Sequence, residues 1–353
     1  MTQQVHVPPF AVIPGVQVHS VLAGQEQRTV DLVEKAYRLH GEGETVNPPS
    51  YFLRFPDRPA SRIIALPASI GGDNRVEGLK WISSFPGNVE SGVPRASAVL
   101  VLNDYSTGYP FACLESSIIS AARTAASAAL AADRLSGERG RPRRIGFIGT
   151  GLIARHIHMY LAGTGWQFDE IGVHDLSAEH ARSFSSYLEQ SGSEARVTVH
   201  EGAEELIRES DLVVFATVAS APHVVDPEWF AHHPVVLNVS LRDLGPEVLL
   251  ASANFVDDVE HVLKADTSPH LVEQCTGSRE FIDGTLYEVL TGKVRPPVDR
   301  TVIFSPFGLG VLDLAVGKHV YDMIQELGEL QVVDGFFHEV DRYGRVDAAA
   351  RCG

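Results

Sequence analysis

The stretch Ile145-Gly146-Phe147-Ile148-Gly149-Thr150-Gly151-Leu152-Ile153-Ala154 is an apolar run followed by the pattern Gly-x-Gly-x-x-Ala. The run predicts a buried strand, and the residues after the second glycine predict the first turn of a helix. In such a unit Gly149 permits a tight turn, Gly151 lets the backbone approach a pyrophosphate, and Ala154 lets helix and strand pack closely. Phosphate groups would then lie at the helix N-terminus. The alternative is an ordinary strand-to-helix turn, so the surrounding sequence decides.

The sequence after this stretch alternates between strand and helix patterns. Strands are predicted at residues 145–148, 171–174, 197–199, 212–216 and 235–239, with helices from Leu152, from Ala178 and near Ala203. This alternation is typical of parallel strands with helices on both faces of the sheet. We therefore predict an α/β fold in which residues 140–305 form a doubly wound Rossmann domain. A dinucleotide would contact its Gly149, Thr150, Gly151, Leu152 and Ile153.

Asp175 ends the second predicted strand of this domain, about 26 residues after Gly149. An acid at this place can bond the ribose hydroxyls of a dinucleotide and repels the 2′-phosphate of NADP. The next residues, Leu176 and Ser177, supply no cation that would reverse this preference. The sequence therefore predicts NAD as the cofactor.

The residues on either side of the Rossmann domain have a different pattern. Before it, helices are predicted at 30–40 and 121–132, and strands at 50–55, 62–67, 76–83, 98–104 and 109–114. After it, apolar residues between 308 and 328 predict a helix that returns to the first part. The polar residues 135–143 indicate a linker. We expect residues 1–139 and 306–353 to form a second α+β domain, which holds the substrate and into which the Rossmann domain is inserted.

Composition excludes several classes of partner. The 353 residues include 29 Lys and Arg and 45 Asp and Glu, a net charge of −16, which repels nucleic acid and anionic lipid. No apolar stretch reaches the roughly 18 residues of a membrane-spanning helix, and the N-terminus lacks a secretory pattern. Cys113, Cys275 and Cys352 are far apart and lack metal-ligand spacing. We expect a cytoplasmic, metal-free protein.

Three cations occur where strand or helix packing would ordinarily favour apolar residues. They are Arg54 after Tyr-Phe-Leu, Lys80 before Trp-Ile, and Arg123 in the Ala-rich helix. In a protein short of positive charge these residues are candidates for binding the carboxylates of a ligand. The arginines can each donate two parallel hydrogen bonds to a carboxylate, and the lysine offers a point charge. Each alone could equally form a salt bridge or lie on an exposed face. The three together favour an anion site.

The sequence resembles the ornithine cyclodeaminase/mu-crystallin family over about residues 45–325. The shared strings are Arg123-Thr124-Ala125-Ala126, Gly149-Thr150-Gly151 and Gly308-Leu309-Gly310-Val311-Leu312-Asp313-Leu314. Further strings are similar to the branch of this family that makes 2,3-diaminopropionate for siderophores or peptide antibiotics. They are Ile63-Ile64-Ala65-Leu66-Pro67, Gly78-Leu79-Lys80-Trp81-Ile82, Arg95-Ala96-Ser97 and Leu102-Asn103-Asp104.

The resemblance implies roles for individual residues. Arg54, Lys80 and Arg123 would contact the substrate, and Lys80 would also favour the neutral amine through its field. Asp243 would be the acid/base. Its place after the strand at 235–239 suits that role, although a solvated loop acid is the alternative. His223, His232 and His233 are less attractive, because no spacing ties them to the cofactor loop. The implied cofactor contacts outside that loop are Thr124, Thr217, Ser240 and Gly308.

Three departures from the cyclodeaminase pattern narrow the expected reaction. Leu241-Arg242 replaces a glycine pair before Asp243, and Glu247 replaces a lysine after it; Pro306-Phe307 replaces a small polar residue. These changes disfavour ornithine cyclisation. The resemblance then implies NAD-dependent oxidative cleavage of N-(2-amino-2-carboxyethyl)-L-glutamate by a homodimer joined through the first-domain sheet. The alternatives are an imine reductase or amino-acid dehydrogenase, a cyclodeaminase, and a crystallin-like protein that binds NAD without turnover.

Overall fold

The computed structural model describes residues 7–338, which form two eight-stranded sheets. The first sheet has the order β16-β1-β7-β6-β5-β4-β2, and β3 also pairs with β4. Its strands are antiparallel except for β1 and β7, which are parallel. The bounds are β1 Ala11–Ile13, β2 Thr45–Val46, β3 Tyr51–Phe55, β4 Arg58–Ile70, β5 Val76–Ser84, β6 Ala96–Asn103, β7 Pro110–Glu115 and β16 Gln331–Val332.

The second sheet is parallel throughout and has the order β10-β9-β8-β11-β12-β15-β13-β14. Four of its strands, β11, β12, β13 and β15, have every residue buried and are rich in β-branched or aromatic side chains, as expected where helices cover both faces. The bounds are β8 Arg144–Ile148, β9 Glu170–His174, β10 Arg196–Val199, β11 Leu212–Phe215, β12 Val235–Asn238, β13 Ala253–Val256, β14 Ile282–Thr285 and β15 Val302–Ser305.

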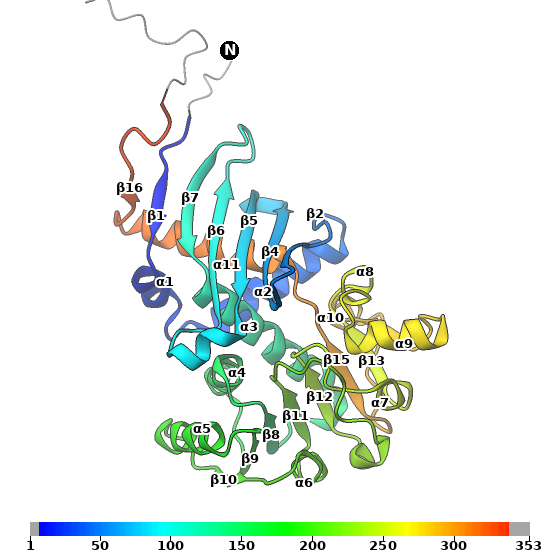
Figure 1. Cartoon of the computed structure of the whole chain (residues 1–353). Helices are drawn as coiled ribbons and strands as arrows, with labels where there is room; N and C mark the ends of the chain where they lie inside the picture. The colour runs from blue at the N-terminus through cyan, green and yellow to red at the C-terminus, as the bar shows by residue number, and fades with distance from the viewer. Residues whose placement is uncertain (1–6, 339–353) are drawn as a thin grey trace, which may run out of the picture.

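Helices pack on both sheets and between them (Figure 1). α11 covers β4, β5 and β6, and the long Ala-rich α3 contacts β6 of the first sheet and β12 of the second. Small side chains on α3 let it pack closely with α2 and α4. The bounds are α1 Gly15–Leu22, α2 Glu26–Gly41, α3 Ser117–Ser136, α4 Leu152–Gly163, α5 Ala178–Gln190, α6 Ala203–Glu209, α7 Pro246–Leu250, α8 Val259–Val262, α9 Ser268–Thr276, α10 Leu286–Leu290 and α11 Gly310–Glu326.

The predicted fold class is confirmed. Every strand of the parallel sheet lies between residues 144 and 305, while α11 and β16 pack on or join the first sheet. The Rossmann unit is therefore inserted between two segments of the first domain. The domain limits of 139/140 and 305/306 stay a prediction, and residues 1–6 and 339–353 of the outer segments lie outside the described part. No described helix is long and apolar enough to span a membrane.

Several strands have no recognisable pattern in the sequence and were not predicted. β13, β14 and β15 complete the Rossmann sheet, while β1 and β16 extend the first sheet by pairing with each other and, for β1, with β7. These strands have two to four residues, which is too short for a periodic pattern. β14 reads Ile-Asp-Gly-Thr and carries little apolar signal. Their pairing depends on tertiary contacts that a short segment does not encode.

Candidate active site

A cavity of about 220 Å³ lies between the two sheets. One wall is the α11-facing side of β3, β4 and β5, and the other is made by α3, by loops that follow Rossmann strands, and by the segment joining β15 to α11. Five of the lining side chains are cationic and one is acidic, which is a strong local reversal of the chain's negative charge. The lining residues are Ser50, Phe52, Arg54, Arg62, Ile64, Leu66, Lys80, Ile82, Arg123, Leu241, Arg242, Ala265, Asp266, Phe307 and Gly308.

The three cations singled out by sequence all line this cavity. Lys80 and Arg123 share the buried carboxylate of Asp313 on α11, with Lys80 Nζ 2.7 Å from Oδ2 and Arg123 Nε 3.2 Å from Oδ1. Lys80 Nζ also donates to Ser120 Oγ at 3.3 Å. One carboxylate therefore holds two cations at the inner end of the cavity, and this group keeps a net positive charge that can bind an anion.

Burial sets the protonation of Lys80. Its side chain is 1% exposed, and desolvation together with the charge of Arg123 lowers the pKa of Lys80 to about 8, although Asp313 opposes the shift. The ammonium is thus charged at neutral pH and loses its proton in mildly alkaline solution.

A second group of cations lies at the other end of the same wall. Arg54 and Arg62 are paired across β3 and β4, and Arg242 reaches this end from the loop after β12. Desolvation lowers the pKa of Arg62, and the charges of Arg242, Arg95 and Arg54 lower it further. Of these three cavity residues, only Arg54 was predicted from the sequence as a site residue; Arg62 and Arg242 were not.

Three lining residues have a backbone conformation that side chains disfavour. Leu241, Ala265 and Asp266 have φ angles of 82°, 55° and 53°, in the left-handed region where glycine is usual. Leu241 thus occupies a glycine-like conformation although it carries a branched side chain. Arg242 Nη2 donates to Ala265 O at 2.9 Å, which joins the two strained segments into one wall. Such strain is retained where surrounding contacts fix the geometry of a site.

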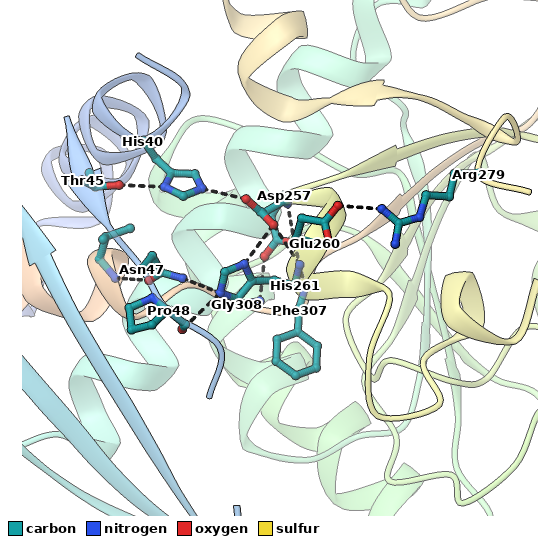
Figure 2. A network of polar contacts seen from close by, with 12 residues as sticks. His40, Thr45, Asn47, Pro48, Asp257, Glu260, His261, Arg279, Phe307 and Gly308 are labelled. Carbon is teal, nitrogen blue, oxygen red and sulfur yellow. Dashed lines mark hydrogen bonds and ion pairs between the residues drawn. The ribbon is translucent and has the colours of Figure 1, made fainter. Parts of the chain in front are cut away.

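Asp257 fixes the segment that forms the cavity's remaining side (Figure 2). Its buried carboxylate accepts hydrogen bonds from Phe307 N at 3.0 Å and Gly308 N at 2.7 Å. Desolvation raises the pKa of Asp257 although these donors oppose the shift. A Cβ on Gly308, whose φ is 94°, would lie 2.7 Å from Arg123 Nη1. Gly308 is therefore required where the backbone passes Arg123, and its predicted contact with the cofactor stays a prediction.

A histidine-carboxylate network beside Asp257 joins the Rossmann unit to the first domain (Figure 2). Asp258 Oδ2 lies 3.0 Å from His40 Nε2, and Asp258 Oδ1 lies 2.9 Å from His261 Nδ1. His261 Nε2 in turn contacts Asn47. Burial alone would raise the pKa of Asp258, but hydrogen bonds from His261 and His40 hold it well below its usual value. The network fixes the position of α2 relative to α8.

The predicted dinucleotide loop has the geometry that its glycines require. Gly149 has φ 85°, and a Cβ there would lie 2.8 Å from the backbone of Ala216. Gly151 is the N-cap of α4 and has open space around its Cβ position, while Ala154 is fully buried. Asp175 accepts from Thr150 N at 3.0 Å and from Thr150 Oγ1 at 2.9 Å, which places it beside the loop. These residues fit NAD.

The remaining predicted cofactor residues lie around this loop or farther from it. Leu152 is 51% exposed at the start of α4, and Ile153 packs against the core. Thr217 follows β11, next to the backbone that Gly149 approaches. Thr124 is on α3, where its hydroxyl donates to Ser120 O at 2.7 Å. Their contacts with a nucleotide stay predictions.

Asp243 is held by three side chains. Its fully buried carboxylate accepts from Thr217 Oγ1 at 2.5 Å and from Ser240 Oγ, and it lies 2.9 Å from His223 Nε2. Asp243 itself does not line the cavity, whereas the two residues before it do. The solvated-acid alternative is wrong, because the side chain is 0% exposed.

His223, which the sequence made a less attractive acid/base candidate than Asp243, lies in direct contact with Asp243. His223 N donates to Asp243 O at 3.0 Å, so backbone and side chain both tie it to the aspartate. The contact joins two loops that follow neighbouring strands, β11 and β12, and sequence spacing cannot reveal it. His232 instead contacts Ser210 O, away from Asp243.

The fold and the cavity together define an α/β protein that has a dinucleotide loop and a cationic pocket. The chain belongs to the ornithine cyclodeaminase/mu-crystallin family, whose model matches residues 14–328. It is 31% identical over 309 residues to N-((2S)-2-amino-2-carboxyethyl)-L-glutamate dehydrogenase of Staphylococcus aureus, covering 84% of this chain and 90% of that protein. The predicted family and its diaminopropionate-forming branch agree with this finding.

Solved structures show the same fold. An archaeal alanine dehydrogenase dimer with bound NAD has a TM-score of 0.81 and 26% identity, over 93% of this chain and 99% of that one. The Δ1-pyrroline-2-carboxylate reductase of Thermococcus litoralis, in complex with NADH and L-proline, has a TM-score of 0.83 at 23% identity, over 92% and 100%. Both structures hold NAD or NADH, in agreement with the predicted cofactor.

Replacing Asp175 tests the choice of dinucleotide. The variant Asp175→Ala removes the acid beside Thr150, so NAD affinity should fall by roughly 10-fold and discrimination against NADP should weaken. Dissociation constants for both nucleotides can be measured by calorimetry, with Asp169→Ala, an exposed acid before β9, as the control. Unchanged preference for NAD in Asp175→Ala would remove Asp175 from cofactor selection.

The lowered pKa of Lys80 predicts a pH effect on anion binding. A carboxylate ligand should bind well below pH 8 and lose affinity as the pH rises through about 8, because the ammonium then becomes neutral. Lys80→Arg keeps the charge and should shift this loss to higher pH. Titrations of the NADH complex with 2-oxoglutarate between pH 6.5 and 9.5 would measure the effect, and identical profiles for the two proteins would contradict the assignment.

Proposed function

We propose that this protein catalyses NAD-dependent oxidative cleavage of N-(2-amino-2-carboxyethyl)-L-glutamate to 2,3-diaminopropionate and 2-oxoglutarate, for siderophore or peptide-antibiotic biosynthesis. The observation that carries the proposal is the cavity, in which five cations face a single acid. The substrate has three carboxylates, and its charge complements that lining. The similarity to the Staphylococcus aureus dehydrogenase over most of both chains supports the same substrate.

Lys80 and Arg123 bind the carboxylate next to the carbon that is oxidised. Asp313 and Ser120 hold these cations in place, so the substrate binds in one orientation, with the α-hydrogen of its glutamate portion toward the cofactor loop. NAD bound at that loop supplies the acceptor for the hydride. Loss of the hydride and of the nitrogen proton leaves an imine.

The imine is then hydrolysed. Water adds to the imine carbon, and the C–N bond breaks as the nitrogen takes a proton, which releases 2-oxoglutarate and the primary amine. Asp243 serves as the acid/base for these transfers, and because its carboxylate does not line the cavity, the protons pass through the side chains that contact it. His223 is 42% exposed and contacts Asp243, so it provides a route by which the carboxylate exchanges protons with solvent. Thr217 and Ser240 orient the carboxylate.

Incubation of the purified protein with NAD and N-(2-amino-2-carboxyethyl)-L-glutamate tests the proposal. NADH should form together with equimolar 2-oxoglutarate and 2,3-diaminopropionate. Asp243→Ala should lower turnover by roughly 10² to 10⁴ while NAD still binds. Asp226→Ala, which removes an acid in the loop before Trp229, is the matched control and should retain full activity.

Other outcomes identify the alternatives. Ammonia release without net NADH would indicate a cyclodeaminase, and turnover of L-alanine or a cyclic imine in place of the tricarboxylate would indicate the smaller-substrate enzymes. Binding of NAD with no turnover of any of these compounds would indicate a crystallin-like protein. Near-normal turnover in Asp243→Ala would remove that residue from the mechanism.

We further propose a homodimer joined through the first-domain sheet. The face of this sheet opposite α11 carries exposed apolar side chains in adjacent strands, namely Tyr51 at 70%, Trp81 at 40% and Val99 at 41%. Ala65 pairs with both Tyr51 and Trp81, and Trp81 pairs with Val99, so these residues form one row across β3 to β6. An apolar row of this kind is typical of a protein interface.

A charge in the apolar row should separate the protomers. Trp81→Glu would bury a carboxylate at the interface, so the particle mass from light scattering should fall from that of a dimer to that of a monomer. Val16→Glu, the same change of charge at an exposed apolar residue on α1, should leave the mass unaltered. A dimeric Trp81→Glu protein, or a monomeric parent, would overturn this arrangement.

A further inference from the structure

The cavity has cations at both of its ends. Lys80 pairs with Leu66 across β4 and β5, and Arg62 lies four residues before Leu66 on the same strand and face. Four residues of strand span roughly 13 Å, so the backbone positions of Lys80 and Arg62 are separated by more than the length of one small amino acid. Two anionic groups of a single ligand can therefore bind at different cations.

No ion pair among the described residues neutralises the outer end of the cavity, where Arg54, Arg62 and Arg242 lie. Among residues 7–338, Arg54, Arg62 and Arg242 have no carboxylate within 4.0 Å, whereas Lys80 and Arg123 share Asp313. Arg62 Nε is buried without any hydrogen-bond partner. Arg62 and Arg242 are half-buried and Arg54 is exposed, so the cost of holding like charges together without an anion falls mainly on the first two.

The nearby acid does not neutralise this group. Asp266 lines the cavity, but its carboxylate lies 3.7 Å from His270 Nδ1 and accepts from Gln274, and it forms no ion pair with the described arginines. Arg242 is held by Ala265 O through Nη2, which fixes its guanidinium at the cavity wall. Arg54 lies over the Phe52 ring, with 5.1 Å between Cζ and the ring centroid.

The wall between the two ends is apolar. Phe52, Ile64 and Ile82 form one row across β3, β4 and β5, and Leu66 continues it toward Lys80. This surface suits methylene groups, so the cavity as a whole complements a chain with a charged group at each end.

We propose that Arg62 and Arg242, assisted by Arg54, form a second carboxylate subsite that selects ligands with a carboxylate remote from the reacting carbon. The inner cations would then bind the carboxylate common to all amino-acid substrates, and the outer subsite would exclude those with a single carboxylate. The inference rests on the proposed function for the identity of the reacting end. The binding of an anion at the outer end is independent of it.

Ligand pairs that differ only in the remote carboxylate test the subsite. Affinities of 2-oxobutyrate, 2-oxoglutarate and 2-oxoadipate for the NADH complex are measured by calorimetry for the parent, Arg62→Met and Arg242→Met. The parent should prefer the dicarboxylates. Each variant should lose about 10- to 100-fold in dicarboxylate affinity and keep its affinity for 2-oxobutyrate, because one charge-assisted contact is removed.

Arg58→Met is the matched control. Arg58 is on the same strand but pairs with Asp57 outside the cavity, so its removal changes the net charge equally without touching the subsite. This control should retain the parent's preference. Each variant is shown to be folded by its melting temperature and by its affinity for NADH.

Equal losses for mono- and dicarboxylates, no loss in either variant, or an equal loss in Arg58→Met would overturn the subsite. If the parent fails to oxidise the proposed amine but the dicarboxylate preference disappears in both cavity variants, the proposed reaction is wrong and the subsite stands. If the amine is oxidised and Arg62→Met and Arg242→Met leave its KM unchanged, the reaction stands and the subsite is wrong.

Discussion

The architecture of the cavity depends on the carboxylate of Asp313, which is fully buried and shared by Lys80 and Arg123. This contact joins α11, β5 and α3, three elements from distant parts of the chain. Removing the carboxylate would leave two buried cations uncompensated, a change that costs about 3–5 kcal/mol in comparable buried pairs. Because one carboxylate pairs with two cations, the group of Asp313, Lys80 and Arg123 keeps a net positive charge. The interaction that stabilises the fold therefore also leaves a site that can bind an anion.

The other wall of the cavity depends on how the Rossmann unit is attached. Asp257 binds the backbone of Phe307 and Gly308, while Asp258 next to it contacts His40 on α2. Adjacent residues thus fix both the segment leading into α11 and the contact with the first domain. Four of the five cavity cations belong to the first domain and the dinucleotide loop belongs to the Rossmann unit, and these buried polar contacts determine the relative position of the two units.

Much of this organisation follows from local sequence. The glycines around Gly149 and the alternating strands identify the Rossmann unit, and cations in apolar strands identify Lys80 and Arg54. The missed residues depend on contacts between distant segments. Asp313 interrupts an apolar helical stripe, a signal that could have marked it as the partner of a buried cation. Arg62 begins the predicted apolar strand at 62–67 and so carries the same signal as Arg54 and Lys80, whereas His223 carries none, because only loop packing brings it to Asp243.

The left-handed residues of the cavity wall keep that wall rigid at a cost in local strain. Leu241, Ala265 and Asp266 each hold a side chain where glycine would relieve local strain of about 1 kcal/mol or more. Glycine would also allow the wall many more shapes. Local strain and a single wall shape are therefore retained together at these positions, and a glycine variant would relieve the strain at the expense of a rigid pocket.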